Sequence, residues 1–145
     1  MRLLRASDLI LHVGDFAARA VLDDLRALGR VKAVHGNVDE PWLRRELPAE
    51  RIVEVCGARI GMVHAAGPAA GREARLMARF PGCGAIVYGH THMAQVELRD
   101  WVWILNPGSP TERRRAPAHT MLLVEVADDG AIEPRLVTLP ARIGS

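Results

Sequence analysis

The sequence predicts an α/β domain built from two β-sheets that pack face to face, with helices outside. Two observations carry this prediction. In the first half of the chain, apolar runs typical of buried strands alternate with segments of helical periodicity. In the second half, turn signals separate short apolar runs at the spacing of antiparallel hairpins. The 145 residues are expected to form one domain over residues 1–145, because about 70% of the unfolded surface can be buried at that length.

The first half is expected to open with a β-α-β unit. Residues 8–13 and 31–35 read as strands, and residues 17–28 carry the apolar spacing of a helix between them. That order predicts a parallel pair joined by a right-handed crossover. Residues 41–48 are expected to form a loop or a single turn. The remaining expected elements are a hairpin of residues 51–55 and 58–63, a helix over residues 72–80 with Ala74, Met77 and Ala78 inward, and a buried strand over residues 85–88.

The second half is expected to consist of two hairpins. The first joins residues 95–98 to residues 101–105, and the second pairs residues 120–126 with residues 132–139. In the first hairpin, Trp101 and Trp103 alternate with apolar neighbours along one strand. Packing or an interface explains these two side chains more simply than a platform for substrate.

The composition excludes several classes of function. The formal net charge is +2 and the basic residues are scattered, so no nucleic-acid partner is expected. No run approaches the roughly 20 apolar residues of a membrane span, and the N-terminus lacks the apolar core of a signal peptide. Cys56 and Cys83 stand apart without metal-binding spacing and are expected to be reduced thiols. The cytoplasm is therefore the expected location.

Five potential metal ligands stand at the ends of apolar runs, where α/β folds place their sites: Asp15, Asn37, His64, His90 and His92. A carboxylate can bridge two cations, an amide supplies a neutral oxygen, and imidazole supplies nitrogen. Such a mixed set suits Mn, Fe, Zn or Ni. Two metals about 4 Å apart could hold a phosphate between them and convert bound water to hydroxide near neutral pH.

The motifs that contain these ligands resemble those of the calcineurin-like metallophosphoesterases. The match is closest to the small bacterial and archaeal phosphodiesterase branch, to which the phosphoesterase-like subunit of the retromer coat is also similar. It covers nearly the whole chain from Asp8 onward. The motifs, in order, are Gly14-Asp15, Gly36-Asn37-Val38-Asp39, Val63-His64, Gly89-His90-Thr91-His92 and Asn106-Pro107-Gly108-Ser109.

The resemblance implies a four-layer α/β/β/α sandwich of two mixed sheets flanked by helices, with a centre of two divalent metals. It implies that Asp15 bridges the metals and that His92 belongs to the first of them. Asn37, His64 and His90 would complete the second site, and Asn37 is also the catalytic candidate.

Two features depart from the family pattern. The family opens with an Asp-x-His motif at the end of its first central strand, and this sequence has no such motif. A strand, loop and helix of average length come to roughly 20–25 residues, about what is missing before Met1. Without that motif the first metal keeps only Asp15 and His92, so one metal or none is conceivable in this short form. In addition, Val38 stands where larger phosphoesterases carry a histidine thought to protonate the leaving group.

Three explanations compete for the missing strand. In the first, which we favour, the gene start has been placed at an internal codon of a longer protein. In the second, a partner or a second copy fills the gap, because an exposed strand edge is costly. In the third, the chain is a degenerate member that binds rather than cleaves.

Other polar residues are expected to play structural parts. His12 is expected to be a hydrogen-bonded histidine, either in the core or in contact with the metal ligands from behind. Asp39 is expected to brace the loop of Asn37. His119 is expected to be structural, whereas His35 could also face a substrate phosphate. A solvated loop is the simplest account of Arg113-Arg114-Arg115.

The resulting hypothesis is a metal-dependent phosphoesterase, specifically a phosphodiesterase that attacks a small phosphate ester with metal-bound hydroxide. The alternative is a catalytically weak or inactive metal-binding scaffold of the retromer-subunit kind, and a mononuclear zinc hydrolase is a third choice. No nucleic-acid or membrane partner is expected, and a homo-oligomer is left open.

Overall fold

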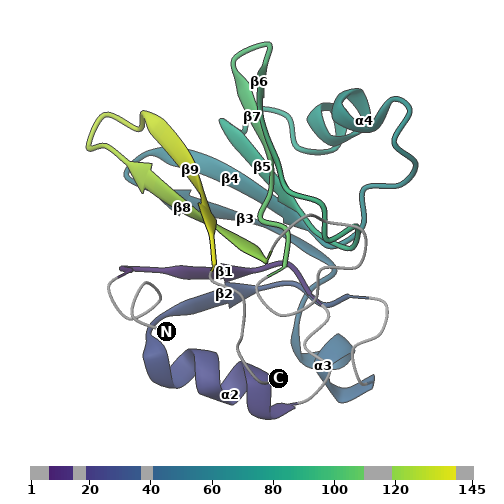
Figure 1. Ribbon diagram of the computed structural model, residues 1–145, viewed down its shortest axis with the longest axis vertical. Helices are drawn as coiled ribbons and strands as arrows, with labels where there is room; N and C mark the ends of the chain where they lie inside the picture. The colour runs from purple at the N-terminus through teal and green to yellow at the C-terminus, as the bar shows by residue number, and fades with distance from the viewer. Residues whose placement is uncertain (1–6, 15–18, 37–40, 110–118, 140–145) are drawn as a thin grey trace.

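The computed structural model describes residues 7–14, 19–36, 41–109 and 119–139 of the chain (Figure 1). The helices are α2 (Arg19–Leu28), α3 (Pro41–Glu46) and α4 (Arg72–Arg79). The strands are β1 (Ile10–His12), β2 (Val31–Ala33), β3 (Glu50–Val55), β4 (Ala58–Val63), β5 (Ala85–Tyr88), β6 (Gln95–Arg99), β7 (Val102–Asn106), β8 (Thr120–Val126) and β9 (Ile132–Thr138).

A five-stranded mixed sheet forms the centre of the fold. Its strand order is β3-β4-β5-β7-β6. The three inner strands run parallel, and the edge strands β3 and β6 pair antiparallel with their neighbours. Both edge strands arise from hairpins, as the sequence predicts. Parallel β4 and β5 therefore deliver the residues that follow them, His64 and Gly89, to the same edge of the sheet.

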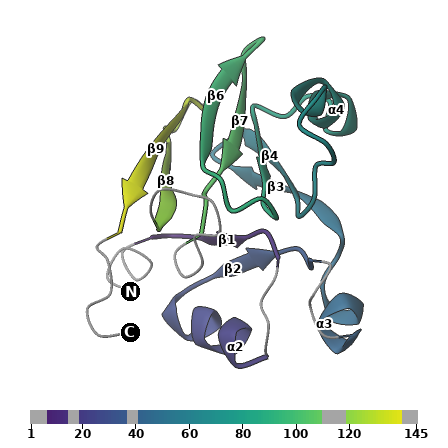
Figure 2. The same cartoon turned by 45° about the vertical axis from the view of Figure 1, so that its right-hand side comes forward.

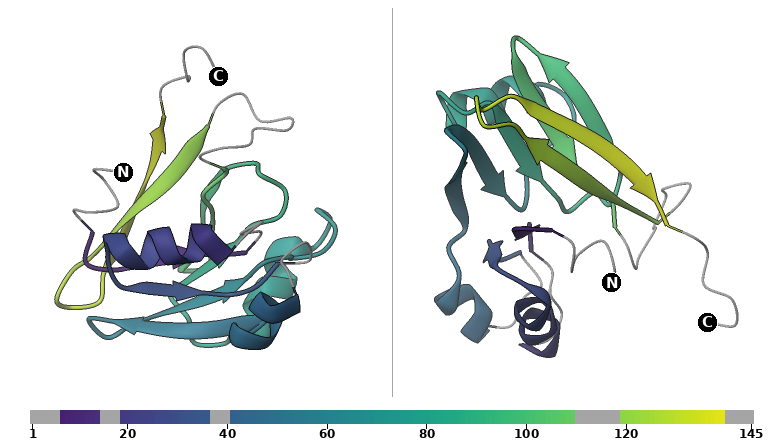
Figure 3. Two further views of the ribbon diagram at one scale, coloured as in Figure 1. Left: turned by 90° about the horizontal axis from the view of Figure 1, so that it is seen from below. Right: turned by 90° about the vertical axis from the view of Figure 1, so that its left-hand side faces the viewer.

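The second layer consists of two separate strand pairs. β1 and β2 run parallel, which confirms the predicted β-α-β unit, and β8 and β9 form the predicted antiparallel hairpin. Among the described residues, neither pair joins another strand. Figure 3 shows β1 and β2 between α2 and the five-stranded sheet, with the β8–β9 hairpin over the same sheet.

Four layers result from the way the helices cover these sheets (Figure 2). Leu76 and Phe80 hold α4 against the outer face of the five-stranded sheet. The inner face packs against β1 through Leu11 and against β8 through Leu122. On the far side of β2, α2 and α3 share a separate apolar cluster around Leu22. This order is the predicted α/β/β/α arrangement.

No helix among the described residues combines the length and apolar character needed to cross a membrane.

The expectation of a loop or single turn over residues 41–48 is wrong. α3 spans Pro41–Glu46 because proline suits the first position of a helix. Leu43 and Leu47 are buried against Leu22 of α2, which gives this short helix an apolar anchor.

The predicted inward face of α4 is also wrong for two of its three residues. Ala74 and Ala78 are exposed, and Met77 is half-buried at the side of the contact. Leu76 and Phe80 are the buried residues instead. The Phe80 ring packs closely on Gly61 of β4. A Cβ added at Gly61 would lie 2.6 Å from the Phe80 ring. The missing side chain at Gly61 thus makes room for the larger apolar residues.

Trp101 and Trp103 do not share a strand, contrary to the prediction from sequence. Trp103 lies on β7 and packs against the inner core, whereas Trp101 occupies the turn before β7 and is 90% exposed. Packing within the chain therefore explains Trp103 but not Trp101.

Candidate metal centre

His64 is the best-defined side chain of the candidate site. It follows β4 directly and is 4% exposed. Its Nδ1 lies 2.6 Å from the carbonyl oxygen of Val13. Because a carbonyl can only accept, Nδ1 carries the hydrogen and the lone pair of the neutral ring resides on Nε2. Metal-binding histidines are commonly oriented in this way, so His64 is prepared to act as an Nε2 ligand.

The turn after β1 meets the turn after β2 beside this ring. A Cβ on Gly14 would stand 2.6 Å from the amide nitrogen of Gly36 and 2.8 Å from Nδ1 of His64. Gly14 also has a φ of +105°, which favours glycine. Only a residue without a side chain allows these three segments to approach so closely.

The glycines of these turns precede two predicted ligands. Asp15 follows Gly14 and Asn37 follows Gly36. Asp15 and Asn37 themselves lie outside the described residues, as do Val38, Asp39 and Arg113-Arg114-Arg115. The structure thus brings the residues just before both predicted ligands to His64.

The loop after β5 reaches the same place. The Gly89 amide donates to the carbonyl oxygen of His64 at 2.9 Å, and a Cβ on Gly89 would lie 2.8 Å from Val13 Cγ2. The ring centroids of His64 and His90 are 5.2 Å apart, with an angle of 77° between the rings. His90 is exposed, so its ring is accessible from solvent.

His92 is half-buried on the same loop. Among the described residues, no three histidine, cysteine, aspartate or glutamate side chains gather closely enough to hold a metal ion. Asp15 and Asn37, which lie outside these ranges, are the predicted further donors. Nitrogen from His64 and His90 together with oxygen from those two residues is a donor set that suits a divalent transition metal.

The remaining predicted histidines lie around this centre. Nδ1 of His12 accepts a hydrogen bond of 3.1 Å from the Gly14 amide and so braces that turn. The backbone amide of His35 donates to Pro48, and its half-buried ring lies against the carbonyl of Gly36. His119 immediately precedes β8, and its carbonyl accepts from the Leu139 amide.

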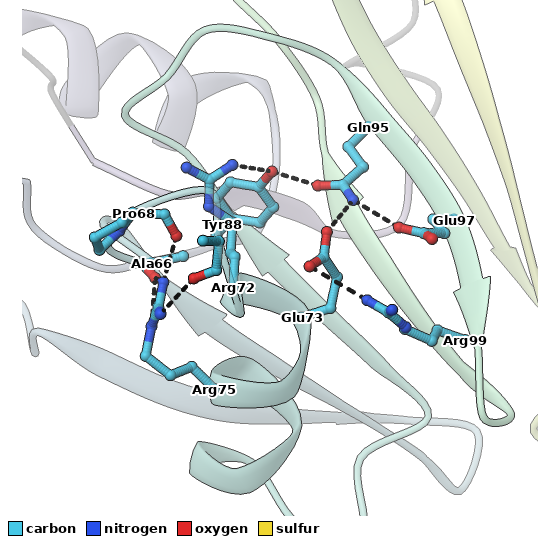
Figure 4. Close-up of polar contacts among 10 residues, drawn as sticks. Ala66, Pro68, Arg72, Glu73, Arg75, Tyr88, Gln95, Glu97 and Arg99 are labelled. Atoms are coloured by element: carbon cyan, nitrogen blue, oxygen red, sulfur yellow. Dashed lines mark hydrogen bonds and ion pairs between the residues drawn. The ribbon is translucent and has the colours of Figure 1, made fainter.

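A polar network that the sequence analysis did not anticipate joins α4 to β5 and β6 (Figure 4). The Tyr88 hydroxyl donates to Gln95, and the Gln95 amide donates to Glu73 at 3.1 Å. The Arg72 guanidinium lies 5.2 Å from the centroid of the Tyr88 ring. Hydrogen bonds from the backbone and from Gln95, with the nearby charge of Arg99, lower the pKa of Glu73. The ionised carboxylate thus ties the helix to the strand that follows the histidine loop.

Two arginines of α4 hold the loop that follows His64. Arg72 donates to the carbonyl oxygen of Gly67 at 3.0 Å, and Arg75 donates to that of Ala70 at 3.0 Å. Arg75 also donates to the carbonyl oxygen of Ala66 at 2.9 Å (Figure 4). Both guanidinium groups thus bind backbone oxygens of the loop between β4 and α4 and tie this loop to the helix.

Comparison with known proteins identifies the family. Residues 1–129 match the family model described as the calcineurin-like phosphoesterase superfamily domain. The chain belongs to this superfamily. This confirms the family resemblance drawn from the motifs, and it places the chain among hydrolases that bind divalent metals.

Two archaeal relatives support the assignment. A probable metallophosphoesterase of Methanocaldococcus jannaschii is 34% identical over 135 residues, which cover 91% of this chain and 67% of that protein. A probable metallophosphoesterase of Methanothermobacter thermautotrophicus is 35% identical over 122 residues, which cover 82% and 70% of the two chains. The chain thus matches about two thirds of the length of these relatives.

Solved structures share the fold. A single mutant of Vps29 from Entamoeba histolytica superposes with a TM-score of 0.75 at 24% identity, covering 96% of this chain and 87% of that one. A Thermotoga maritima protein gives 0.71 at 29% identity, with coverage of 94% and 84%. An archaeal phosphodiesterase gives 0.67 at 20% identity, with coverage of 90% and 83%. These likenesses confirm the mixed α/β architecture of the superfamily.

Proposed function

We propose that this protein is a metal-dependent phosphoesterase, and specifically a phosphodiesterase that acts on a small phosphate ester. The observation that carries the proposal is His64, whose Nδ1 hydrogen bond to Val13 leaves Nε2 as the ligand atom. His90 stands against this ring, and the turns that lead to Asp15 and Asn37 meet beside it. On this proposal, four strand ends would supply nitrogen and oxygen donors to one place.

The residues present fit a divalent metal. Asp15, Asn37, His64 and His90 would hold it as the second metal of the family pattern, and His92 with Asp15 would serve the first. When bound, such an ion neutralises charge on the phosphate and makes a water-derived nucleophile available near neutral pH. We favour Mn²⁺ or Ni²⁺, because the donor set mixes oxygen with imidazole.

The chain itself would contribute orientation and access. The Val13 carbonyl keeps His64 in one tautomer, so this ligand needs no rearrangement when the metal binds. His90 is exposed and so lies where a substrate enters from solvent. Asn37 would contribute a neutral amide that both binds metal and orients the phosphate. Positioning and charge neutralisation account for most of phosphoryl-transfer catalysis, and these contributions support the proposed reaction.

The direct test is hydrolysis of bis(p-nitrophenyl) phosphate with Mn²⁺ or Ni²⁺. We expect turnover that EDTA abolishes and that falls to the metal-free level in Asp15→Ala and in His90→Ala. His119→Ala is the matched control, because this histidine immediately precedes β8 and is not a predicted ligand, and it should keep the wild-type rate. Full activity in both of the first two variants would refute the proposal. Faster hydrolysis of p-nitrophenyl phosphate would make the enzyme a monoesterase instead.

A binding module is the second candidate function. The observation in its favour is Trp101, which is 90% exposed at the tip of the β6–β7 hairpin, and Leu98 on β6 of the same hairpin is 51% exposed. Contiguous exposed apolar patches mark interaction surfaces, and this candidate takes the two side chains as part of such a patch. This candidate predicts a stable protein complex and no turnover, so hydrolysis that depends on added metal would exclude it. Under either function we place the protein in the cytoplasm, without a nucleic-acid or membrane partner.

A further inference from the structure

Asn106 is a fully buried polar residue at the end of β7, with 0% of its surface exposed. Since β5 and β7 are parallel neighbours, the end of β7 lies beside the loop that follows β5. The Asn106 Nδ2 donates to the carbonyl oxygen of Gly89 at 3.4 Å and to the hydroxyl of Thr91 at 3.1 Å. Its Oδ1 accepts from the Gly108 amide at 2.9 Å. The amide group thus joins the turn after β7 to the loop that carries His90 and His92.

That loop has an unusual backbone. His90 has a φ of +71° and His92 a φ of +59°, values that residues with side chains rarely adopt. Such conformations persist only where the surroundings impose them. Here hydrogen bonds hold Thr91, the residue between the two histidines. The Thr91 amide donates to the Gly89 carbonyl at 2.9 Å. The Thr91 hydroxyl, in turn, accepts from the Met93 amide at 3.2 Å and from Asn106.

We propose that Asn106, acting through Thr91, is a positioning residue that fixes the backbone of His90 and His92, and that metal affinity depends on this contact. The inference rests on the proposed function to the extent that the two histidines are ligands. It assigns a role to the Asn-Pro-Gly-Ser motif that local sequence does not reveal. Groups behind metal ligands that hold them in place typically alter metal affinity by about 10- to 100-fold.

The turn after β7 has a second support that does not touch the histidine loop. The Thr120 hydroxyl donates to the Pro107 carbonyl at 2.8 Å, and the Thr120 amide donates to the Ser109 carbonyl at 2.9 Å. Thr120 is buried, as are the first and last residues of the turn, Asn106 and Ser109. Replacing its hydroxyl therefore perturbs the same turn without removing a contact to Thr91, which makes Thr120 the matched control.

The test compares Thr91→Val, Thr91→Ser and Thr120→Val by calorimetric titration with Mn²⁺ alone. Thr91→Val removes the hydroxyl at nearly constant volume, and we expect its Mn²⁺ affinity to fall at least about tenfold. Thr91→Ser keeps the hydroxyl and should bind as the wild type does, and so should Thr120→Val. Asn106→Asp removes the Nδ2 group that donates to Gly89 and Thr91, and it should show the same loss of Mn²⁺ affinity. If Asn106→Asp does not fold, Thr91→Val decides the matter.

A second measurement uses the metal-free protein. In Thr91→Val, we expect hydrogen exchange of the Met93 amide to quicken, because this amide donates to the lost hydroxyl. Unchanged Mn²⁺ affinity in Thr91→Val, an equal loss in Thr120→Val, or a wild-type protein that binds no Mn²⁺ would each overturn the inference. Tight Mn²⁺ binding that depends on Thr91 but supports no hydrolysis would uphold it and refute the proposed function.

Discussion

Gly14 shows how much of the candidate site depends on single residues. Its missing side chain lets the ends of β1 and β2 approach His64, and its φ of +105° adds a second reason for glycine. The sequence places a glycine before Asp15 but cannot show this crowding, because the neighbours come from Gly36 and His64, far along the chain.

We predict that Gly14→Ala destabilises the protein by about 2–4 kcal/mol, because a crowded Cβ and a strained φ act together. Gly57→Ala is the control. Gly57 also has a positive φ, +82°, but a Cβ there would meet nothing within 4 Å, so only the strain of about 1 kcal/mol remains. Urea unfolding of both variants measures the difference. Equal losses would show that crowding at Gly14 is unimportant.

The residues of the site differ in how far local sequence reveals them. His64 and His90 could be found because each stands at the end of an apolar run, and the structure brings these two rings together. Asn106 could not be assigned a role, because its partners Gly89 and Thr91 belong to another strand's loop. Asp15 and Asn37 remain predictions, since they lie outside the described residues.

At the scale of elements, α4 shows why a periodic pattern is ambiguous. Its sequence offers a small-residue face with Ala74 and Ala78 and a larger apolar face with Leu76 and Phe80. The choice depends on the sheet beneath, where Gly61 leaves space for the Phe80 ring. That information is not local to the helix. The parallel pairing of β1 and β2, by contrast, could be predicted from the order of elements alone.

The contact of α4 with the five-stranded sheet yields a prediction about stability. Leu76 is 1% exposed and packs in the cluster with Phe80 and Tyr88, so Leu76→Ala should cost about 2–4 kcal/mol of unfolding free energy. Ala78→Ser, on the exposed face of the same helix, should stay within about 0.5 kcal/mol of the wild type. Denaturant unfolding measures both variants. A small loss in Leu76→Ala would mean that α4 is not held by this face.

At the scale of the whole molecule, the fold class follows from alternating elements in the first half and hairpins in the second. The layers could be predicted from these, but the division of the second layer into two separate strand pairs, as seen in the described part of the chain, could not. Local sequence specifies which segments are strands, whereas the packing of β1 and β8 on the same inner face is decided by side chains such as Leu11 and Leu122.

The metal content of the whole chain is the last prediction. The second metal's predicted ligands are Asp15, Asn37, His64 and His90, whereas the residues of this sequence supply two predicted ligands, Asp15 and His92, to the first. We therefore expect about one metal per chain after saturation with Mn²⁺ and removal of the excess, because a site with two protein ligands holds metal weakly. Elemental mass spectrometry measures this ratio. In His64→Ala it should fall close to zero, since the oriented Nε2 ligand is lost, whereas His119→Ala should leave it unchanged. A ratio near two would show that the first site finds further ligands, and a ratio near zero in the wild type would favour the binding module over the enzyme.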